Sequence, residues 1–147
     1  MSSLRQKVQV VLLWLSPDNK CQLLRLKTNA NRGGFWQNVT GGVEAGESLS
    51  TAASRELQEE TGLLVSKLIE MHQTFDFVDQ YGKSCQESVY LAIIRQSTPP
   101  SIIISSEHIE YDFYAIERVK RDDFGYNSNY EAFSQAVSYI TKSDDDL

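Results

Sequence analysis

Cysteine and proline are scarce in this chain of 147 residues, which contains two cysteines and three prolines. Cys21 and Cys85 lie far apart and have no C-x-x-C or His-flanked spacing, so neither a disulfide scaffold nor a zinc site is supported. The few prolines and the hydrophobic content of 41% exclude a disordered or fibrous chain. We therefore expect one globular domain over residues 1–147, in a reducing cytoplasm.

Long apolar runs and a surplus of positive charge are also missing. No segment is long enough to span a bilayer, and the apolar run 8–15 is followed by a Ser-Pro-Asp-Asn turn instead of a signal-peptide cleavage site. The chain has 14 Lys and Arg against 20 Asp and Glu, and its net charge of -6 argues against binding a nucleic-acid duplex. An acidic protein can still act on a small polyanion if a bound cation reverses the local charge.

Hydrophobic patterning predicts a mixed α/β (α+β) fold that opens with a β-hairpin. Apolar and β-branched runs bounded by turn residues predict strands, with a loop at residues 29–34. The expected strands are residues 8–15, 21–26, 35–39, 63–65, 69–77, 88–94 and 109–116. Residues 49–61 lack Gly and Pro and predict a helix, with Ser48 as its N-cap and Gly62 just past its end.

A second helix is predicted near the end of the chain. Ser128 and Glu131 have the spacing of a capping box, and apolar residues then recur at helical intervals. These apolar residues are Tyr130, Phe133, Val137 and Ile140. Residues 143–147, with three successive aspartates, are expected to form a frayed tail.

Acidic residues are concentrated between positions 44 and 60, where Arg55 is the single basic residue. They are Glu44, Glu47, Glu56, Glu59 and Glu60. At 100° per residue, the last three fall within an arc of about 100° on the predicted helix. One interpretation is a solvated acidic face, because like charges on an exposed helix cost only about 0.2–0.5 kcal/mol.

The apolar neighbours of this face favour a second interpretation, a metal site. Leu49, Ala53 and Leu57 adjoin the sector of Glu56 and Glu60 and place these carboxylates at the edge of the core. Two carboxylates about 6 Å apart repel by roughly 3 kcal/mol at an effective dielectric constant near 20. A hard cation such as Mg²⁺ or Mn²⁺ would relieve this repulsion, bind substrate phosphates and activate water to hydrolyse an anhydride.

The stretch 41–63, GGVEAGESLSTAASRELQEETGL, resembles the Nudix box, G-x5-E-x7-R-E-U-x-E-E-x-G-U, where U is a bulky aliphatic residue. All nine fixed positions are filled, by Gly41, Glu47, Arg55, Glu56, Leu57, Glu59, Glu60, Gly62 and Leu63. The resemblance implies the Nudix fold, a mixed β-sheet sandwiched between α-helices. It also implies a hydrolase of nucleoside diphosphates linked to another moiety.

The resemblance further assigns roles to residues of the box. Glu56, Glu59 and Glu60 would hold Mg²⁺ or Mn²⁺, with Glu44 as a further ligand candidate. Arg55 would orient a carboxylate, in keeping with its i,i+4 relation to Glu59, and Glu47 would support the junction of loop and helix. Gly41 and Gly42 either form an ordinary turn or bring backbone groups next to the ion or a phosphate.

The residues before the box extend the likeness to one subgroup. Residues 35–41, Phe-Trp-Gln-Asn-Val-Thr-Gly, are similar to the Phe-Trp-Gln-x-Val-Thr-Gly of dihydroneopterin triphosphate pyrophosphatases, as is the region from Glu107 onward. Glu107 would then be a metal ligand or the general base, and a solvated loop carboxylate is the alternative. His108 is expected to be a bystander. Thr40 stands where many family members have a glycine whose carbonyl binds the metal.

Four further residues are candidates for substrate binding. Phe35 and Trp36 would stack on a base or pterin ring, with core packing as the alternative. Lys27 and Arg32 would meet the phosphates, with ordinary surface charge as the alternative.

Three hypotheses about function follow. The first is a Mg²⁺-dependent enzyme that releases pyrophosphate from a nucleoside triphosphate or dihydroneopterin triphosphate. The second is an enzyme of the same fold acting on a dinucleoside polyphosphate or nucleotide sugar, and the third is a non-catalytic nucleotide sensor. All three bind a small nucleotide or pterin phosphate, as a monomer or homodimer.

Overall fold

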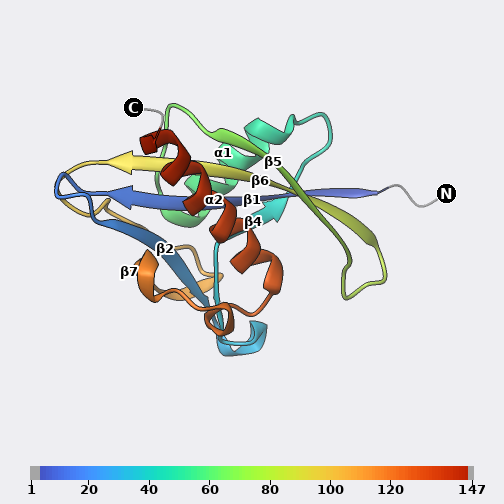
Figure 1. Ribbon diagram of the computed structural model, residues 1–147. Coiled ribbons are helices and arrows are strands. Elements are labelled where there is room, and N and C mark those ends of the chain that lie inside the picture. The colour runs from blue at the N-terminus through green and yellow to red at the C-terminus, as the bar shows by residue number, and fades with distance from the viewer. Residues whose placement is uncertain (1–3, 146–147) are drawn as a thin grey trace.

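The computed structural model describes residues 4–145, in which a seven-stranded mixed sheet lies between two helices (Figure 1). The strands are β1 (Arg5–Leu15), β2 (Cys21–Thr28), β3 (Trp36–Gln37), β4 (Val39–Gly42), β5 (Ile69–Val78), β6 (Ser84–Arg95) and β7 (His108–Ala115). The helices are α1 (Leu49–Thr61) and α2 (Asn127–Asp145), with short 3-10 helices η1 (Ala30–Arg32), η2 (Ile116–Arg118) and η3 (Arg121–Asp123). None of the helices described is long and apolar enough to cross a membrane.

Strand β1 is the centre of the sheet, which has the order β3-β2-β1-β6-β5. β1 runs parallel to β6 along its whole length. On its other side it pairs antiparallel with β4 near its start, where Lys7 faces Gly42, and with β2 near its end, where Leu13 faces Leu23. β7 pairs with β2. Because β4 leads directly to α1, the start of β1 lies beside the beginning of the acidic segment.

Alternate residues of β1 pack against the two helices. Val8 and Leu12 belong to a core cluster that includes Leu57 of α1, whereas Val11 and Leu13 belong to a cluster with several residues of α2. Side chains of a strand point alternately to its two faces, so one strand contributes to both layers. Figure 1 shows α2 in front of the sheet and α1 behind it. The expected sheet sandwiched between helices is confirmed.

Helix α1 has the predicted bounds and caps. The Ser48 hydroxyl accepts a hydrogen bond from the Thr51 N–H at 3.2 Å, and Gly62 follows the helix in the left-handed conformation, with φ 76°. Both caps satisfy backbone groups that the helix leaves without an internal partner. The predicted hairpin of β1 and β2 is also confirmed.

Several predicted elements were wrong in detail. Residues 63–65 form no strand: Leu63 and Val65 pack on the α1 cluster and Leu64 is exposed, so the apolar run reflects packing alone. The expected strand 35–39 is divided at Asn38 into β3 and β4, because the Asn38 N–H donates to the Asn129 side chain.

The closing helix and its flanks also differ from expectation. α2 begins at Asn127, so Ser128 lies inside the helix and is not its N-cap. The loop 29–34 contains η1. α2 continues to Asp145 into the tail expected to fray from residue 143, and residues 146 and 147 lie outside the described part of the chain.

Candidate active site

The end of β4 and the face of α1 meet at Gly41 and Glu56. A β-carbon built on Gly41 would lie 2.0 Å from the carboxyl carbon of Glu56, a distance at which two atoms overlap. The φ angle of Gly41 is not positive, so what this position requires is space and not an unusual backbone. The first glycine of the box therefore leaves room for a carboxylate of the helix to lie against the strand.

Arg55 holds the loop and the helix together. Its guanidinium donates to both carboxylate oxygens of Glu47, at 2.8 and 2.9 Å, and to the Gly42 carbonyl at 2.8 Å. It also donates to Glu56 at 2.9 Å and to Glu59 at 3.2 Å. The hydrogen bonds from Arg55 lower the pKa of Glu47 to about 2, and the bond with Glu47 raises the pKa of Arg55 above its ordinary value.

Glu60 is the most deeply buried carboxylate of the site, with 3% of its surface exposed. It accepts a hydrogen bond from the Thr40 backbone N–H at 3.3 Å. Burial, together with the nearby Glu107 and Glu56 carboxyl groups, raises the pKa of Glu60 to about 9. Burial also raises the pKa of Glu56. Removing a carboxylate from water disfavours its charged form, so these groups favour a cationic partner.

A cavity of about 240 Å³ opens over these carboxylates. Its lining consists of Arg5, Lys7, Arg32, Gln37, Thr40, Gly41, Gly42, Glu56, Glu60 and Glu107. Residues from five separate segments of the chain therefore converge on one space. Arg32 and Glu107 also form an ion pair of 3.5 Å.

Seven of the residues predicted from the sequence line this cavity: Arg32, Thr40, Gly41, Gly42, Glu56, Glu60 and Glu107. Arg55 lies just beneath it and binds Glu56. Glu59 and Glu44 do not line it; their side chains are 57% and 70% exposed and face Arg55 at 3.2 and 3.9 Å.

The predicted aromatic residues are not part of the cavity lining. Phe35 stacks edge-on against Tyr126, and Trp36 lies over the guanidinium of Arg25 at 4.2 Å. Lys27 also lies near the ring of Trp36, at 5.7 Å, and outside the cavity lining. Stacking of Phe35 or Trp36 on a substrate stays a prediction.

Sequence reasoning missed three residues of the cavity: Arg5, Lys7 and Gln37. The alternation of Arg5 and Lys7 at the start of the first strand was an available signal, because alternate residues of a strand share a face. His108, expected to be a bystander, is 5% exposed, and its Nε2 lies 3.3 Å from the Gln37 side-chain oxygen. Burial lowers the pKa of His108.

The carboxylates of the cavity have the chemistry to bind a divalent cation, but their side chains do not converge on one point. Within residues 4–145, no three acidic, His or Cys side chains are placed so as to hold a metal ion together. Arg55 holds Glu56 and Glu59 by hydrogen bonds of 2.9 and 3.2 Å. The donor set nevertheless consists of hard oxygen ligands, and the buried Glu60 lies between two other carboxyl groups.

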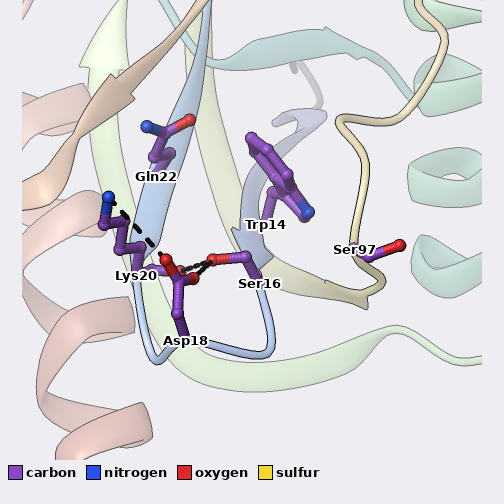
Figure 2. Close-up of a pocket in the computed structure, with 6 residues that line it drawn as sticks. All are labelled: Trp14, Ser16, Asp18, Lys20, Gln22 and Ser97. Atoms are coloured by element: carbon purple, nitrogen blue, oxygen red, sulfur yellow. Dashed lines mark hydrogen bonds and ion pairs between the residues drawn. The ribbon is translucent and has the colours of Figure 1, made fainter.

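A second cavity, of about 290 Å³, lies at the opposite end of β1 (Figure 2). It is lined by Trp14, Ser16, Asp18, Lys20, Gln22 and Ser97. Its polar groups bind one another: Ser16 donates to Asp18, which also forms an ion pair of 3.7 Å with Lys20. The acidic segment contributes no residue to this cavity.

The family of the chain follows from comparison with known proteins. The model of the NUDIX domain matches residues 5–135, and the chain therefore belongs to the Nudix family. An RNA pyrophosphohydrolase from Pelagibacter ubique is 44% identical over 66 residues, which are 45% of this chain and 39% of that protein. The chain covers between 13% and 39% of the length of the first four curated relatives that it matches.

Solved structures agree with this fold. The dihydroneopterin triphosphate pyrophosphohydrolase of E. coli superposes with a TM-score of 0.73 at 26% identity, covering 92% of this chain and 97% of that one. An Ap4A hydrolase from C. elegans superposes with a TM-score of 0.79 at 20% identity, covering 95% and 99% of the two chains.

Proposed function

We propose that this chain is a divalent-metal-dependent pyrophosphohydrolase that converts a nucleoside or pterin triphosphate and water to a monophosphate and pyrophosphate. The observation that carries the proposal is the buried carboxylate of Glu60, flanked by Glu56 and Glu107 at the base of a cavity that basic residues also line. Supporting it, the Pelagibacter relative is named an RNA pyrophosphohydrolase, and the E. coli structure is that of a dihydroneopterin triphosphate pyrophosphohydrolase.

The proposed metal ligands are Glu56, Glu59 and Glu60, with the Thr40 carbonyl and Glu44 as additional candidates. A bound Mg²⁺ or Mn²⁺ would supply a Lewis acid for a phosphoryl oxygen and lower the pKa of a water molecule. Arg55 keeps Glu56 and Glu59 oriented through its hydrogen bonds. Arg32 would bind substrate phosphate.

Glu107 is the proposed general base. Its side chain is 46% exposed, lines the cavity and pairs with Arg32 at 3.5 Å. A carboxylate in this place can take a proton from the attacking water while remaining in contact with solvent.

One assay tests the proposal. We expect Mg²⁺-dependent release of pyrophosphate from at least one member of a panel of nucleoside triphosphates and dihydroneopterin triphosphate. The Glu60→Gln variant should lose at least about 100-fold in kcat, the loss that follows removal of a group that stabilises transition-state charge. Glu131→Gln, an exposed glutamate on the other helix, is the matched control and should retain the wild-type rate.

The products separate the proposal from its alternatives. Release of two mononucleotides from a dinucleoside polyphosphate, without pyrophosphate from any triphosphate, would indicate the second hypothesis. Binding of nucleotides without turnover of any substrate would indicate a sensor. A wild-type rate in Glu60→Gln would contradict the proposed role of the buried carboxylate.

A further inference from the structure

Two cations from the first strand lie in the cavity, on the side of Gly42. Arg5 and Lys7 are alternate residues of β1, and Lys7 is the register partner of Gly42 on β4. The Arg5 guanidinium approaches the same glycine, since a β-carbon built on Gly42 would lie 3.2 Å from Nη2 of Arg5. Both positive groups are therefore placed at one end of the cavity.

The other end of the cavity carries a different cation. The Thr40 N–H binds Glu60 there, and Glu107 pairs with Arg32. Gly42 is two residues further along β4, about 7 Å away at 3.4 Å per residue. A substrate that spans the cavity would thus meet positive charge on both sides of the carboxylates.

Arg5 is held much less firmly than Arg55. Arg55 makes several hydrogen bonds of 2.8 to 3.2 Å, whereas Arg5 is 47% exposed and contacts Asp79 at 3.6 Å, too long for a hydrogen bond. The five N–H donors of a guanidinium match phosphate oxygens in a bidentate manner. The Lys7 ammonium lies over the Phe77 ring at 5.6 Å, and Lys7 lines the same cavity.

We propose that Arg5 and Lys7 form a subsite for the phosphates beyond the bond that is cut, so that this chain selects substrates with three phosphates over those with two. This inference rests on the proposed function and names the residues that would select its triphosphate substrate. The nucleoside or pterin end of the substrate would lie toward β3, which contributes Gln37 to the cavity and carries Trp36. The terminal phosphates would then reach the Gly42 end.

Direct binding tests the subsite with two probes that differ by one phosphate. The α,β-methylene analogues of adenosine triphosphate and adenosine diphosphate are titrated, with Mg²⁺, into the wild-type protein and into Arg5→Gln/Lys7→Gln. We expect the wild type to bind the triphosphate analogue at least about tenfold more tightly, the scale of one charge-assisted hydrogen bond to phosphate. The double variant should bind both analogues with similar affinity.

Arg95→Gln is the matched control, because Arg95 is an exposed arginine at the opposite end of the same parallel strand pair. It should keep the wild-type preference. Arg5→Lys keeps the charge and loses the bidentate geometry, so its preference for the triphosphate analogue over the diphosphate analogue should be intermediate. This single variant reports on the subsite even if the double variant is poorly folded. A preference that survives in a folded double variant, or that is absent from the wild type, would overturn the subsite.

The outcome is separable from that of the proposed function. If the wild type prefers the triphosphate analogue through Arg5 and Lys7 but releases no pyrophosphate from any triphosphate, the subsite stands and the proposed activity fails. If it hydrolyses triphosphates and the preference is independent of Arg5 and Lys7, the activity stands and the subsite fails.

Discussion

At the residue scale, the first glycine of the acidic segment and the first glutamate of its helical triad form one packing unit. The contact between the Gly41 backbone and the Glu56 carboxylate leaves no space for a side chain at position 41. Sequence reasoning identified both residues but not this relation, because residues fifteen apart in sequence give no local pattern that reveals a contact. Space for the Glu56 carboxylate is the physical role of this glycine.

Gly41→Ala should destabilise the protein by about 1–3 kcal/mol, because the added methyl group displaces the Glu56 carboxylate or shifts β4. In the Glu56→Ala background the same substitution should cost much less, since the overlapping group is gone. Chemical denaturation of the four proteins of this double-mutant cycle measures the coupling. Equal costs in the two backgrounds would show that the contact does not determine the need for glycine.

At the scale of the elements, a buried network of amides connects α2 to the strands of the site. Asn129 of α2 accepts from the Asn38 N–H at 2.8 Å, and the Asn38 side chain donates to Gln9 of β1 at 2.7 Å. Gln9 in turn donates to Glu87 of β6 at 2.8 Å. The network divides the segment into β3 and β4, and so fixes where Thr40 meets Glu60.

This network makes stability depend on pH through Glu87. Burial raises the pKa of Glu87 above its ordinary value of 4.5. The folded state therefore binds a proton more tightly than the unfolded state, and the stability that Glu87 contributes is present at low pH and is lost as pH rises above 4.5 through the folded pKa. The difference in unfolding free energy between wild type and Glu87→Gln should accordingly shift against the wild type as pH rises. Denaturation curves that keep a constant difference from pH 4 to pH 8 would contradict this.

The elements that the sequence predicted correctly depend on local signals, whereas the missed features depend on contacts between distant residues. Helix α1 was predictable because its caps and composition are local, and β1, β5 and β6 because their apolar runs are long. Residues 63–65 were mistaken for a strand, since burial of Leu63 and Val65 on a helix gives the same apolar pattern as a ladder. The break at Asn38 depends on Asn129, 91 residues away, and no local pattern contains it.

At the scale of the whole molecule, charge is distributed unevenly in a way that suits a polyanionic ligand. The chain has a net charge of -6, yet the cavity is lined by three cations as well as three glutamates. A bound divalent ion would therefore make the cavity positive within an acidic protein. The sequence revealed the acidic half of this site through its motif and also Arg32, whereas the position of Arg5 and Lys7 depends on how β1 pairs with β4. The extent of a single domain over residues 1–147 stays a prediction, although the family model covers most of the chain.

The account depends most on the claim that the helical carboxylates bind a divalent ion, and electron paramagnetic resonance of Mn²⁺ measures this binding without any substrate. Titration of Mn²⁺ with the wild-type protein should remove the signal of the free ion, and Mg²⁺ should restore it by competition. Glu60→Gln should bind Mn²⁺ at least about tenfold more weakly, because it replaces the most buried of the proposed carboxylate ligands by a neutral amide. Equal binding by the wild type and Glu60→Gln, or no binding by either, would contradict the account.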